Sequence, residues 1–438
     1  MHIHFLGLGG IGISALARYY LKKNHQISGS DLVSSEITEI FKKKGVKLFI
    51  GKHSSKNISK SIDLVIYSPA ISQNNPELIK AKKLGIKVLS YPEALGELTK
   101  KHFTIAISGT HGKSTTTAMI GLLLTKAGFD PTVIVGTKLK EFANSNCRIG
   151  NSKYLVIEAD EWQASFLNYW PKIIVLTNIE REHLDYYRNL TNILRAFHSY
   201  ILHLPKDGFL IVNQDDENIR KIISNFQFPV INFQLSKSKD VQILEKILKI
   251  PGKHNIDNAL AALAVARVLK ILDKISFKAL SGYQGSWRRF EEHQLKIENR
   301  ELKIISDYAH HPTEIMATLK AAREKYPQKE IWCVYQPHQY QRTYYLFNDF
   351  VKVFRKAPIN KLILTDIYAV AGREAPEIQK KVSSDKLVKA INKKEVIYLK
   401  KKKILDYLKK NLKDRDVIII MGAGDIYKLS QDILKLSK

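Results

Sequence analysis

Short apolar runs of four to six residues alternate along this chain with longer stretches that have helical spacing of apolar residues. The short runs are rich in valine, isoleucine and leucine and end in glycine or polar residues, which is typical of buried strands in parallel sheets. The longer stretches predict crossover helices, so the alternation predicts an α/β fold. The predicted strands are His2–Leu6, Gln26–Ser28, Leu64–Tyr67, Lys87–Ser90, Thr104–Ile107, Tyr154–Ile157, Ile173–Leu176, Lys303–Ser306, Glu330–Tyr335, Lys361–Leu364 and Val417–Met421.

Two breaks divide the pattern into three α/β domains. The chain has 438 residues, enough for two to four domains with buried cores. One break falls at Lys100-Lys101, before a strand with a glycine-rich end, and another at the glycine- and arginine-rich segment Gly285–Phe290. We predict domains at 1–100, 101–286 and 287–438. The predicted helices are Ile11–Leu21, Ala118–Leu124, Ala259–Leu272, which has an amphipathic pattern, and Thr313–Arg323.

The segment Ile105–Thr117, IAISGTHGKSTTT, predicts a phosphate-binding loop between a strand and a helix. Glycines let backbone N–H groups turn toward phosphate oxygens, and the N-terminus of the helix adds partial positive charge. In such a loop Lys113 reaches the β- and γ-phosphates and the Ser114 hydroxyl ligates Mg²⁺. Only two residues separate Gly109 from Gly112, which disfavours an ordinary GTPase or kinase loop. The simpler alternative is a glycine turn without a ligand.

A second glycine-rich turn, Gly7–Gly12, follows the first predicted strand with the spacing G-x-G-x-x-G. This spacing, with Asp31 about 20 residues further on, is typical of a dinucleotide-binding βαβ unit. It predicts a diphosphate at the N-terminus of the next helix and places Asp31 near a ribose or near the loop. The motif does not distinguish a nicotinamide cofactor from another diphosphate nucleotide.

Polar side chains follow most of the remaining predicted strands. Glu158 ends one strand of the central domain, where a phosphate-loop fold holds a Mg²⁺ ligand, and His183 follows the next strand as a further candidate. Asn255 and Asn258 precede a helix, which they cap unless they bind an adenine edge. Four more clusters follow strands of the C-terminal domain, where open α/β sheets bind ligands. They are Asp307–Glu314, Gln336–Thr343, Thr365–Tyr368 and Gly422–Asp425.

Composition narrows the class of protein. Hydrophobic residues make up 45% and charged residues 26% of the chain, and no run approaches about 20 apolar residues. The first residues lead directly into a predicted strand without a basic segment, so we expect no signal peptide. Two cysteines fit a reducing compartment, so we expect a cytoplasmic protein without a membrane span. The net charge of +28 would suit nucleic-acid binding. The lysines are spread over the whole chain without a base-stacking module, so we expect no nucleic-acid partner.

In their order along Ile3–Asp425, the motifs resemble the Mur ligase family of peptidoglycan synthesis, in particular the branch that joins L-alanine to UDP-N-acetylmuramate. The resemblance implies a Rossmann-like UDP-sugar-binding domain, a central ATP-binding P-loop domain with a mixed or parallel sheet, and a Rossmann-like domain that binds the amino acid. It implies that ATP, with Mg²⁺, phosphorylates the lactyl carboxylate to an acyl phosphate, which the amino group then attacks. We expect a monomer or weak homodimer. The motifs are SGTHGKSTTT, EADE, TNIEREHLD, HNIDN, RRF, DYAHHPTE, QPHQYQRT and MGAGD.

The resemblance also assigns site residues by position. The ATP-binding residues would be Gly109, Thr110, His111, Gly112, Lys113, Ser114, Thr115, Asn255, Asn258, Arg289 and Asp307. The Mg²⁺ ligands would be Ser114, Glu158 and His183. The UDP-sugar and the amino acid would contact Gly9, Gly10, Ile11, Gly12, Ser30, Asp31, Asn146, Tyr308, His310, His338 and Arg342. Catalytic roles fall to Lys113 on the phosphoryl group, to His310 as proton acceptor and to Arg342 beside the amino acid.

Departures from the family pattern leave alternatives open. Trp162 and Gln163 stand where Ser-Asp is usual, and an aromatic there resembles the murein-peptide recycling ligase, which adds a tripeptide. Gln339 replaces an arginine after Pro-His, which leaves one guanidinium for a carboxylate and opens a changed amino-acid preference. No lysine lies between His183 and Lys206 to be carbamylated, so a second Mg²⁺ is open. From other classes, a nicotinamide oxidoreductase and a nucleic-acid-binding ATPase remain as alternatives.

Overall fold

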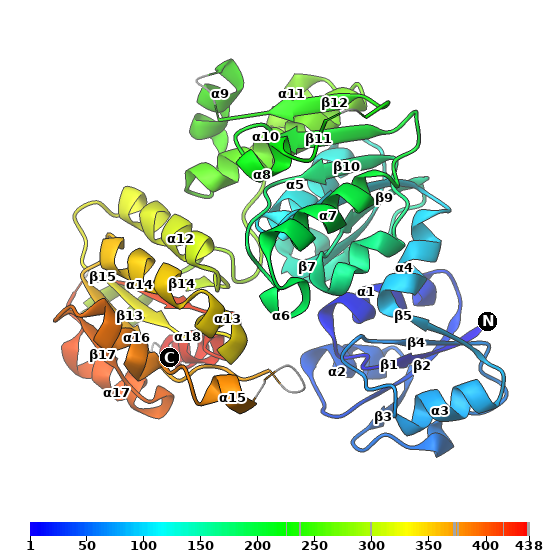
Figure 1. Cartoon of the computed structure of the whole chain (residues 1–438), viewed down its shortest axis with the longest axis horizontal. Coiled ribbons are helices and arrows are strands. Elements are labelled where there is room, and N and C mark those ends of the chain that lie inside the picture. Colours follow the sequence, from blue (N-terminus) through cyan, green and yellow to red (C-terminus); the bar gives the residue numbers. More distant parts are fainter. Residues whose placement is uncertain are drawn as a thin grey trace. The chain divides into compact units, whose positions relative to one another are not determined.

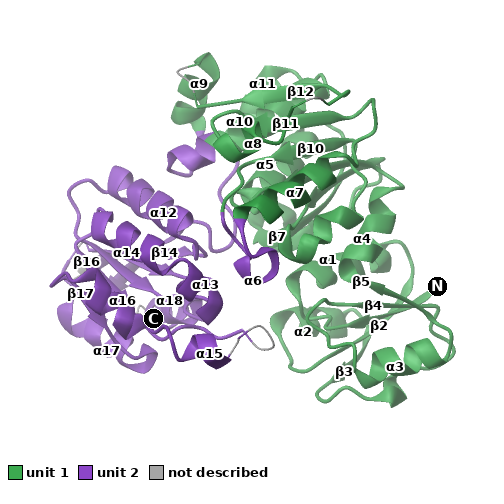
Figure 2. Cartoon of the chain, viewed as in Figure 1, with its two compact units in different colours: residues 1–180, 190–247, 257–282 green, residues 181–189, 248–256, 283–438 purple. Residues whose placement is uncertain are grey.

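The computed structural model describes residues 1–224, 226–235, 238–297, 300–370, 374, 376–414 and 416–435. The chain forms three sheets flanked by helices, which confirms the predicted fold class (Figure 1). Contacts divide it into two compact units, with residues 1–180, 190–247 and 257–282 in unit 1 and residues 181–189, 248–256 and 283–438 in unit 2 (Figure 2). Unit 1 contains the first two sheets and unit 2 the third. The domain boundaries at 100 and 286 stay predictions.

The first sheet of unit 1 has five parallel strands in the order β3-β2-β1-β4-β5. From β1 the chain adds strands first on one side, β2 and β3, and then on the other, β4 and β5. Open α/β sheets bind ligands at such a switch point, and the glycine turn Gly7–Gly12 follows β1. Strand β2 continues through Asp31 instead of ending at Ser28, because Gly29–Asp31 stays in register with β3. The elements are β1 (His2–Leu6), α1 (Ile11–Lys22), β2 (Gln26–Asp31), α2 (Glu36–Lys43), β3 (Lys47–Ile50), η1 (Ser55–Asn57), β4 (Leu64–Tyr67), α3 (Pro76–Lys83), β5 (Lys87–Ser90) and α4 (Tyr91–Thr99).

The second sheet of unit 1 has seven strands in the order β12-β11-β10-β6-β9-β7-β8, with only β8 antiparallel to its neighbour. It is therefore the mixed sheet that was expected of the central region. The phosphate loop follows β6, which lies between β10 and β9. The strands are β6 (Phe103–Ser108), β7 (Thr132–Leu139), β8 (Ser145–Arg148), β9 (Tyr154–Glu158), β10 (Ile173–Leu176), β11 (Phe209–Asn213) and β12 (Val230–Phe233). The helices are α5 (Lys113–Lys126), η2 (Lys140–Phe142), η3 (Trp162–Asn168), α7 (Leu190–Ile201), α8 (Glu217–Arg220), α9 (Lys239–Ile247) and α11 (Asp273–Ser281).

Helix α10 (Lys253–Val268) differs from its prediction in position and in character. It begins at Lys253 instead of Ala259, so Asn255 and Asn258 lie within the helix and not ahead of it. It is also not amphipathic, because every residue from 258 to 266 is buried. A helix that is apolar on all sides belongs inside a protein, and the alanines of this segment allow close packing around it.

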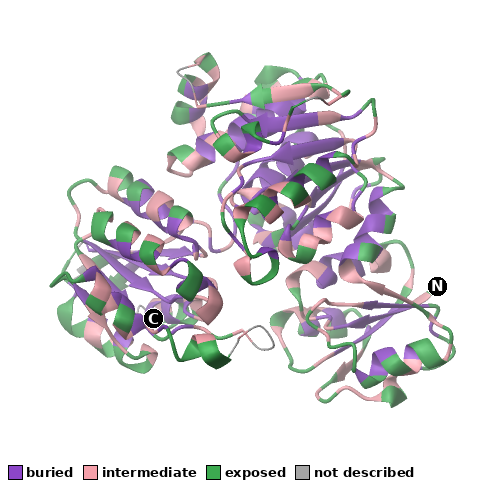
Figure 3. Cartoon of the chain, in the orientation of Figure 1, coloured by how far each residue is buried: buried purple, intermediate pink, exposed green. Residues whose placement is uncertain are grey.

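The sheet of unit 2 has six strands in the order β13-β14-β18-β15-β16-β17, and only β13 is antiparallel. Apolar clusters cover both of its faces, and alternate residues of β18 belong to opposite clusters, as the two-residue period of a strand requires. The central strands of this sheet are buried (Figure 3). The strands are β13 (Glu291–Ile297), β14 (Arg300–Asp307), β15 (Ile331–Tyr335), β16 (Lys361–Leu364), β17 (Val396–Tyr398) and β18 (Val417–Met421). The helices are α6 (Leu184–Tyr187), α12 (Pro312–Lys325), α13 (Tyr340–Tyr345), α14 (Phe347–Lys356), α15 (Pro376–Gln379), α16 (Ser384–Ile391), α17 (Lys401–Asn411) and α18 (Tyr427–Leu434).

Among the described helices, none combines the length and the apolar character needed to cross a membrane.

A buried carboxylate, Glu77, joins the helix α3 to the first sheet. Its Oε2 accepts hydrogen bonds from His4 and Ser30, both at 2.9 Å, and its Oε1 accepts from His53 at 2.9 Å and from Asn57 at 3.0 Å. Burial alone would raise the pKa of Glu77, but these hydrogen bonds outweigh burial and lower the pKa to about 2. The charged form of Glu77 is therefore part of the fold.

We expect the stabilisation by Glu77 to be lost on acidification. Because the pKa is about 2 in the folded chain and 4.5 as the ordinary value, the contribution is complete above about pH 4.5 and lost as the pH falls toward 2. It amounts to on the order of 3 kcal/mol. Urea unfolding of the wild type and of Glu77→Gln should differ at pH 7 and converge near pH 2.5. If the difference in unfolding free energy between the two proteins did not change with pH, the charge of Glu77 would not be its cause.

Candidate active site

The phosphate loop joins β6 to α5 as predicted, and both of its glycines are required. Their φ angles are +134° at Gly109 and +82° at Gly112, a region that favours glycine. A Cβ at Gly109 would lie 2.2 Å from Thr177 Oγ1, and one at Gly112 would lie 2.4 Å from Asn258 Oδ1. Gly112, the N-cap residue of α5, has no side chain to cap the helix, as suits the N-terminus of an anion-binding helix.

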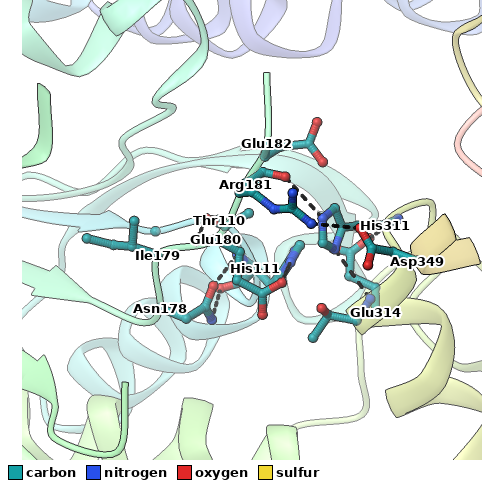
Figure 4. Close-up of polar contacts among 12 residues, drawn as sticks. Thr110, His111, Asn178, Ile179, Glu180, Arg181, Glu182, His311, Glu314 and Asp349 are labelled. Carbon is teal, nitrogen blue, oxygen red and sulfur yellow. Dashed lines mark hydrogen bonds and ion pairs between the residues drawn. The ribbon is translucent and has the colours of Figure 1, made fainter. Parts of the chain in front are cut away.

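The segment after β10 holds the loop in place (Figure 4). Thr110 N donates to Asn178 O at 2.9 Å, and His111 N donates to Asn178 Oδ1 at 2.8 Å. Glu180 N donates to Thr110 Oγ1 at 2.8 Å, and the His111 imidazole lies 3.6 Å from the Glu180 carboxylate. The backbone amides of Thr110 and His111 are thus used by the protein itself. Asn178, inside the TNIE motif, is a loop-supporting residue that sequence reasoning missed.

The ammonium group of Lys113 lies over the loop and is bound by it. Its Nζ donates to Gly109 O at 2.6 Å, to Thr110 O at 3.2 Å and to Glu161 Oε2 at 2.7 Å. Burial alone would lower the pKa of Lys113, but Glu161 and its acidic neighbours outweigh burial and raise it, so Lys113 is charged at neutral pH. Burial raises the pKa of Glu161 to about 7. In this structure Glu161 is therefore the ionic partner of Lys113.

Two of the predicted Mg²⁺ ligands, Ser114 and Glu158, are in contact. Ser114 Oγ donates to Glu158 Oε1 and Oε2 at 3.0 and 2.9 Å, and Gly136 N donates to Glu158 Oε2 at 2.8 Å. These hard oxygen donors at the start of α5 are the ligand type that Mg²⁺ prefers. The third predicted ligand, His183, belongs to unit 2, where it precedes α6 with a φ of 53°.

The amide side chains of α10 have different surroundings. Asn258 is buried against the phosphate loop, and its Oδ1 accepts a hydrogen bond from Thr116 Oγ1 at 3.1 Å. Asn255 Nδ2 donates to Pro251 O at 2.6 Å. Thr115 is buried in the first turn of α5. Asn258 therefore supports the loop in addition to any contact with a nucleotide.

The glycine turn after β1 is braced by Asp31. Gly9 N donates to Asp31 Oδ2 at 2.8 Å, and a Cβ at Gly9 would lie 2.9 Å from the same oxygen. Asp31 thus lies near the loop, one of its two predicted positions. No described side chain caps α1 at Gly10, which leaves the amides of Ile11 and Gly12 open to a diphosphate.

Ser30 and Asn146 differ in how they relate to this turn. Ser30 is 1% exposed and its Oγ donates to Glu77 at 2.9 Å, so its side chain points into the buried cluster. Adjacent residues of a strand face opposite sides, so Ser30 and Asp31 cannot both face the turn. Asn146 reaches from β8 and donates to the carbonyl oxygen of Ile11. Asn146 is thus beside the predicted diphosphate site, and the Ser30 side chain is not.

In unit 2, Asp307 fixes the segment that follows β14. Its Oδ2 accepts from Phe290 N at 2.8 Å and its Oδ1 accepts from Ala309 N at 2.7 Å. Burial raises the pKa of this carboxyl, while the nearby charge of Arg289 acts in the opposite direction. Each carboxylate oxygen of Asp307 still has a lone pair that these backbone amides do not use, and the predicted ribose contact would use one of these lone pairs.

Two arginines enclose the ring of Tyr308. The buried Arg288 lies 4.8 Å and Arg289 5.1 Å from the ring centre. Tyr308 N donates to Arg288 O at 2.7 Å, and the Arg288 guanidinium donates to the carbonyl oxygen of Gly422. Arg288 thereby connects the RRF, DYAHHPTE and MGAGD motifs within unit 2.

Arg342 is paired with a carboxylate of the chain itself. Its Nε donates to Glu182 Oε1 and Oε2 at 3.0 and 3.2 Å, and its Nη2 lies 2.9 Å from Glu182 Oε1. Its Nη1 donates to His338 O at 3.1 Å. Burial alone would raise the pKa of Glu182, but Arg342 holds it well below its ordinary value. This ion pair borders a pocket that Gln339 and Tyr345 also line.

The two histidines predicted to contact the UDP-sugar or the amino acid, His310 and His338, also lie in unit 2. His310 Nδ1 is 3.1 Å from Tyr308 O and 3.3 Å from Glu314 Oε2. Burial lowers the pKa of His310 to about 3, so the imidazole is neutral at pH 7 and a weak base in this conformation. The His338 ring stacks on Tyr368 with 5.5 Å between the ring centres. Gln339 has a φ of 71°.

A phosphate loop with an adjoining hydroxyl–carboxylate pair, a second glycine turn before a helix and a third α/β sheet are typical of a multidomain nucleotide-dependent enzyme. Comparison with protein families is specific: residues 2–103 match the Mur ligase family catalytic domain, residues 107–266 the Mur ligase middle domain, and residues 288–424 the Mur ligase glutamate ligase domain. The chain belongs to the Mur ligase family.

Individual relatives match along the whole chain. A UDP-N-acetylmuramate–L-alanine ligase of Acetivibrio thermocellus is 42% identical over 460 aligned residues, covering 99% of this chain and 96% of that protein. One of Clostridium tetani is 41% identical, covering 99% and 98%. The crystal structure of the UDP-N-acetylmuramate–alanine ligase MurC of Thermotoga maritima matches with a TM-score of 0.79 at 26% identity, covering 99% and 98%. A murein peptide ligase of Psychrobacter arcticus shares the fold, with a TM-score of 0.72 at 23% identity, covering 100% and 98%.

Proposed function

We propose that this chain joins L-alanine to the lactyl carboxylate of UDP-N-acetylmuramate, with conversion of ATP to ADP and phosphate, in the synthesis of peptidoglycan precursors. The observation that carries the proposal is 42% identity with an enzyme of that name along 99% of the chain. The local geometry agrees, because unit 1 combines a diphosphate-type turn with a phosphate loop that has a charged lysine.

The phosphate loop of unit 1 performs the activation step. A carboxylate is a poor electrophile, and transfer of the γ-phosphoryl group to it supplies a leaving group. Amides at the start of α5 bind phosphate oxygens, and Lys113 exchanges Glu161 for the transferring phosphoryl group, whose charge it stabilises. Asn178 and Asn258 keep the loop in this shape from two sides.

Ser114 and Glu158 fit a Mg²⁺ ion. Their oxygens already lie within hydrogen-bonding distance, at the place where a phosphate loop presents its hydroxyl. Bound Mg²⁺ would neutralise charge on the phosphate oxygens. His183 is the further ligand that the family resemblance proposes.

Unit 2 would bind the amino acid, whose amino group attacks the acyl phosphate. Arg342, which lines the same pocket as Gln339, is proposed to bind the carboxylate of the amino acid. The substrate carboxylate would then replace Glu182 as the ionic partner of Arg342. His310 is proposed to accept the proton of the attacking amine. It is neutral, as this role requires, but its pKa of about 3 makes it a weak base in this conformation, so the role requires a less buried imidazole. We propose that the protein acts in the cytoplasm, as a monomer or a weak homodimer.

The test is an ADP-release assay with an amino-acid panel. We expect release that requires both UDP-N-acetylmuramate and an amino acid, with L-alanine the best substrate. Gln339→Arg should lower the KM for the amino acid several-fold, because a second guanidinium joins the carboxylate site. Preference for the tripeptide L-alanyl-γ-D-glutamyl-diaminopimelate would instead establish the recycling ligase, and ADP release without UDP-N-acetylmuramate would refute both.

A further inference from the structure

Tyr91, the first residue of α4, stands at the N-terminus of α1. A Cβ at Gly12 would lie 3.1 Å from Tyr91 Cζ and 3.3 Å from its hydroxyl oxygen, so the ring lies directly against the first turn of that helix. The amides of this turn have no described side-chain cap and are open to a diphosphate. None of the sequence motifs includes Tyr91.

The phenol of Tyr91 is also subject to the negative charges at the end of the central sheet's β9. Burial is the largest cause that raises the pKa of Tyr91, and the charges of Glu158 and Asp160 add to it. Tyr91 is therefore protonated at neutral pH and can donate one hydrogen bond. Among the described residues no group accepts that hydrogen bond, although the ring is half-buried. Glu158 in turn contacts Ser114 at the start of α5.

The backbone around Tyr91 is fixed on both sides of the ring. Ser90 and Glu93 form a capping box at the start of α4. Further along α4, a Cβ at Gly96 would lie 2.3 Å from Asn168 O, so the helix packs closely on η3, the segment that follows β9. A side chain carried on such a rigid element suits precise recognition of a substrate.

We propose that the Tyr91 hydroxyl binds the muramoyl part of the UDP-sugar and donates its hydrogen bond to the lactyl carboxylate. This inference rests on the proposed function. A substrate with its diphosphate on α1 and its carboxylate toward the phosphate loop must pass the Tyr91 ring, because this ring lies against the first turn of α1 and α4 packs on the segment that follows β9. The acceptor is charged, which strengthens a hydrogen bond from a neutral donor.

Tyr91→Phe removes only the hydroxyl and tests this contact. We expect the KM for UDP-N-acetylmuramate to rise about tenfold or more, as loss of a hydrogen bond to a charged group does, with the KM values for ATP and L-alanine unchanged. Inhibition constants of UDP and UDP-N-acetylglucosamine should not change, because neither carries the lactyl carboxylate. Tyr20→Phe is the matched control, since Tyr20 lies near the other end of α1, where its ring packs on Phe5 and His25.

Two outcomes would overturn the inference in a variant that keeps the wild-type melting temperature. One is an unchanged KM for UDP-N-acetylmuramate, and the other is equal weakening of UDP and UDP-N-acetylmuramate, which would place the hydroxyl at the nucleotide end. Calorimetric binding of UDP-N-acetylmuramate to wild type and Tyr91→Phe gives the same comparison without turnover. Absence of ADP release in the wild type would refute the proposed function, and the binding measurement would still decide the role of Tyr91.

Discussion

Replacement of Lys113 by methionine is expected to lower the rate of ADP release by about a hundred- to a thousandfold. The methionine keeps most of the side-chain volume and removes the charge that stabilises the transferring phosphoryl group, an effect that is worth on the order of 3–4 kcal/mol for a single well-placed donor. The three described hydrogen bonds of Lys113 all lie at the phosphate loop, where its Nζ donates to Gly109 O, Thr110 O and Glu161 Oε2. No other described cation takes part in these contacts, so none can substitute for it there.

The measurement is ADP release at saturating UDP-N-acetylmuramate and L-alanine, with the ATP concentration varied. Lys126→Met is the matched control, because Lys126 is exposed at the C-terminal end of the same helix and should leave the rate unchanged. Loss of Lys113 also leaves Glu161 without its cation. Because burial already raises the pKa of Glu161 to about 7, Glu161 should take up a proton in the variant, which limits the cost in stability. A rate within tenfold of the wild type would remove Lys113 from the chemistry.

Local motifs predicted the phosphate loop itself, and long-range packing determines which other residues contact the loop. SGTHGKS encodes strand, loop and helix within a dozen residues, so Lys113 and Ser114 could be placed from spacing alone. Glu161 and Asn178 contact the same loop from segments 48 and 67 residues away, and nothing in a local pattern assigns them there. Their roles depend on the strand order of the central sheet.

Two differences between the predictions and the structure have clear physical causes. Ser30 was assigned to the substrate from its place beside Asp31, but strand β2 extends through both residues and turns the serine toward Glu77. The alternation of arginine and lysine with apolar residues in Ala259–Leu272 indicated an amphipathic helix. In the structure the residues of α10 from 258 to 266 are all buried. Arg267 lies in the last turn of the helix and Lys270 lies beyond its end.

The ion pair between Arg342 and Glu182 was the least predictable feature of unit 2. The two residues are 160 positions apart, and one follows a strand of the central sheet while the other lies in α13. The QPHQYQRT motif indicates a cation for a substrate carboxylate, but it gives no sign that the chain supplies a carboxylate of its own. The pairing is therefore a finding of the structure, and it determines what a substitution at Arg342 does.

Replacement of Arg342 by methionine is expected to destabilise unit 2 by about 3–5 kcal/mol and to abolish ligation. The side chains of Arg342 and Glu182 are only 6% and 8% exposed, so removal of the guanidinium leaves a buried carboxylate without its partner. The double variant Arg342→Met, Glu182→Met should recover most of the stability, because an apolar pair of similar volume costs no desolvation. It should recover none of the activity.

Urea unfolding of both variants at pH 7, with ADP release measured in parallel, separates the two effects. Arg181→Met is the control for an ordinary ion pair: Arg181 lies 2.8 Å from Asp349, but the side chains are 53% and 32% exposed, so the change should stay within about 1 kcal/mol (Figure 4). Acidification should narrow the gap between Arg342→Met and the wild type, since protonation of Glu182 removes the unpaired charge. A double variant as unstable as the single one would show that Arg342 stabilises unit 2 through its other contacts, and an active double variant would remove Arg342 from amino-acid binding.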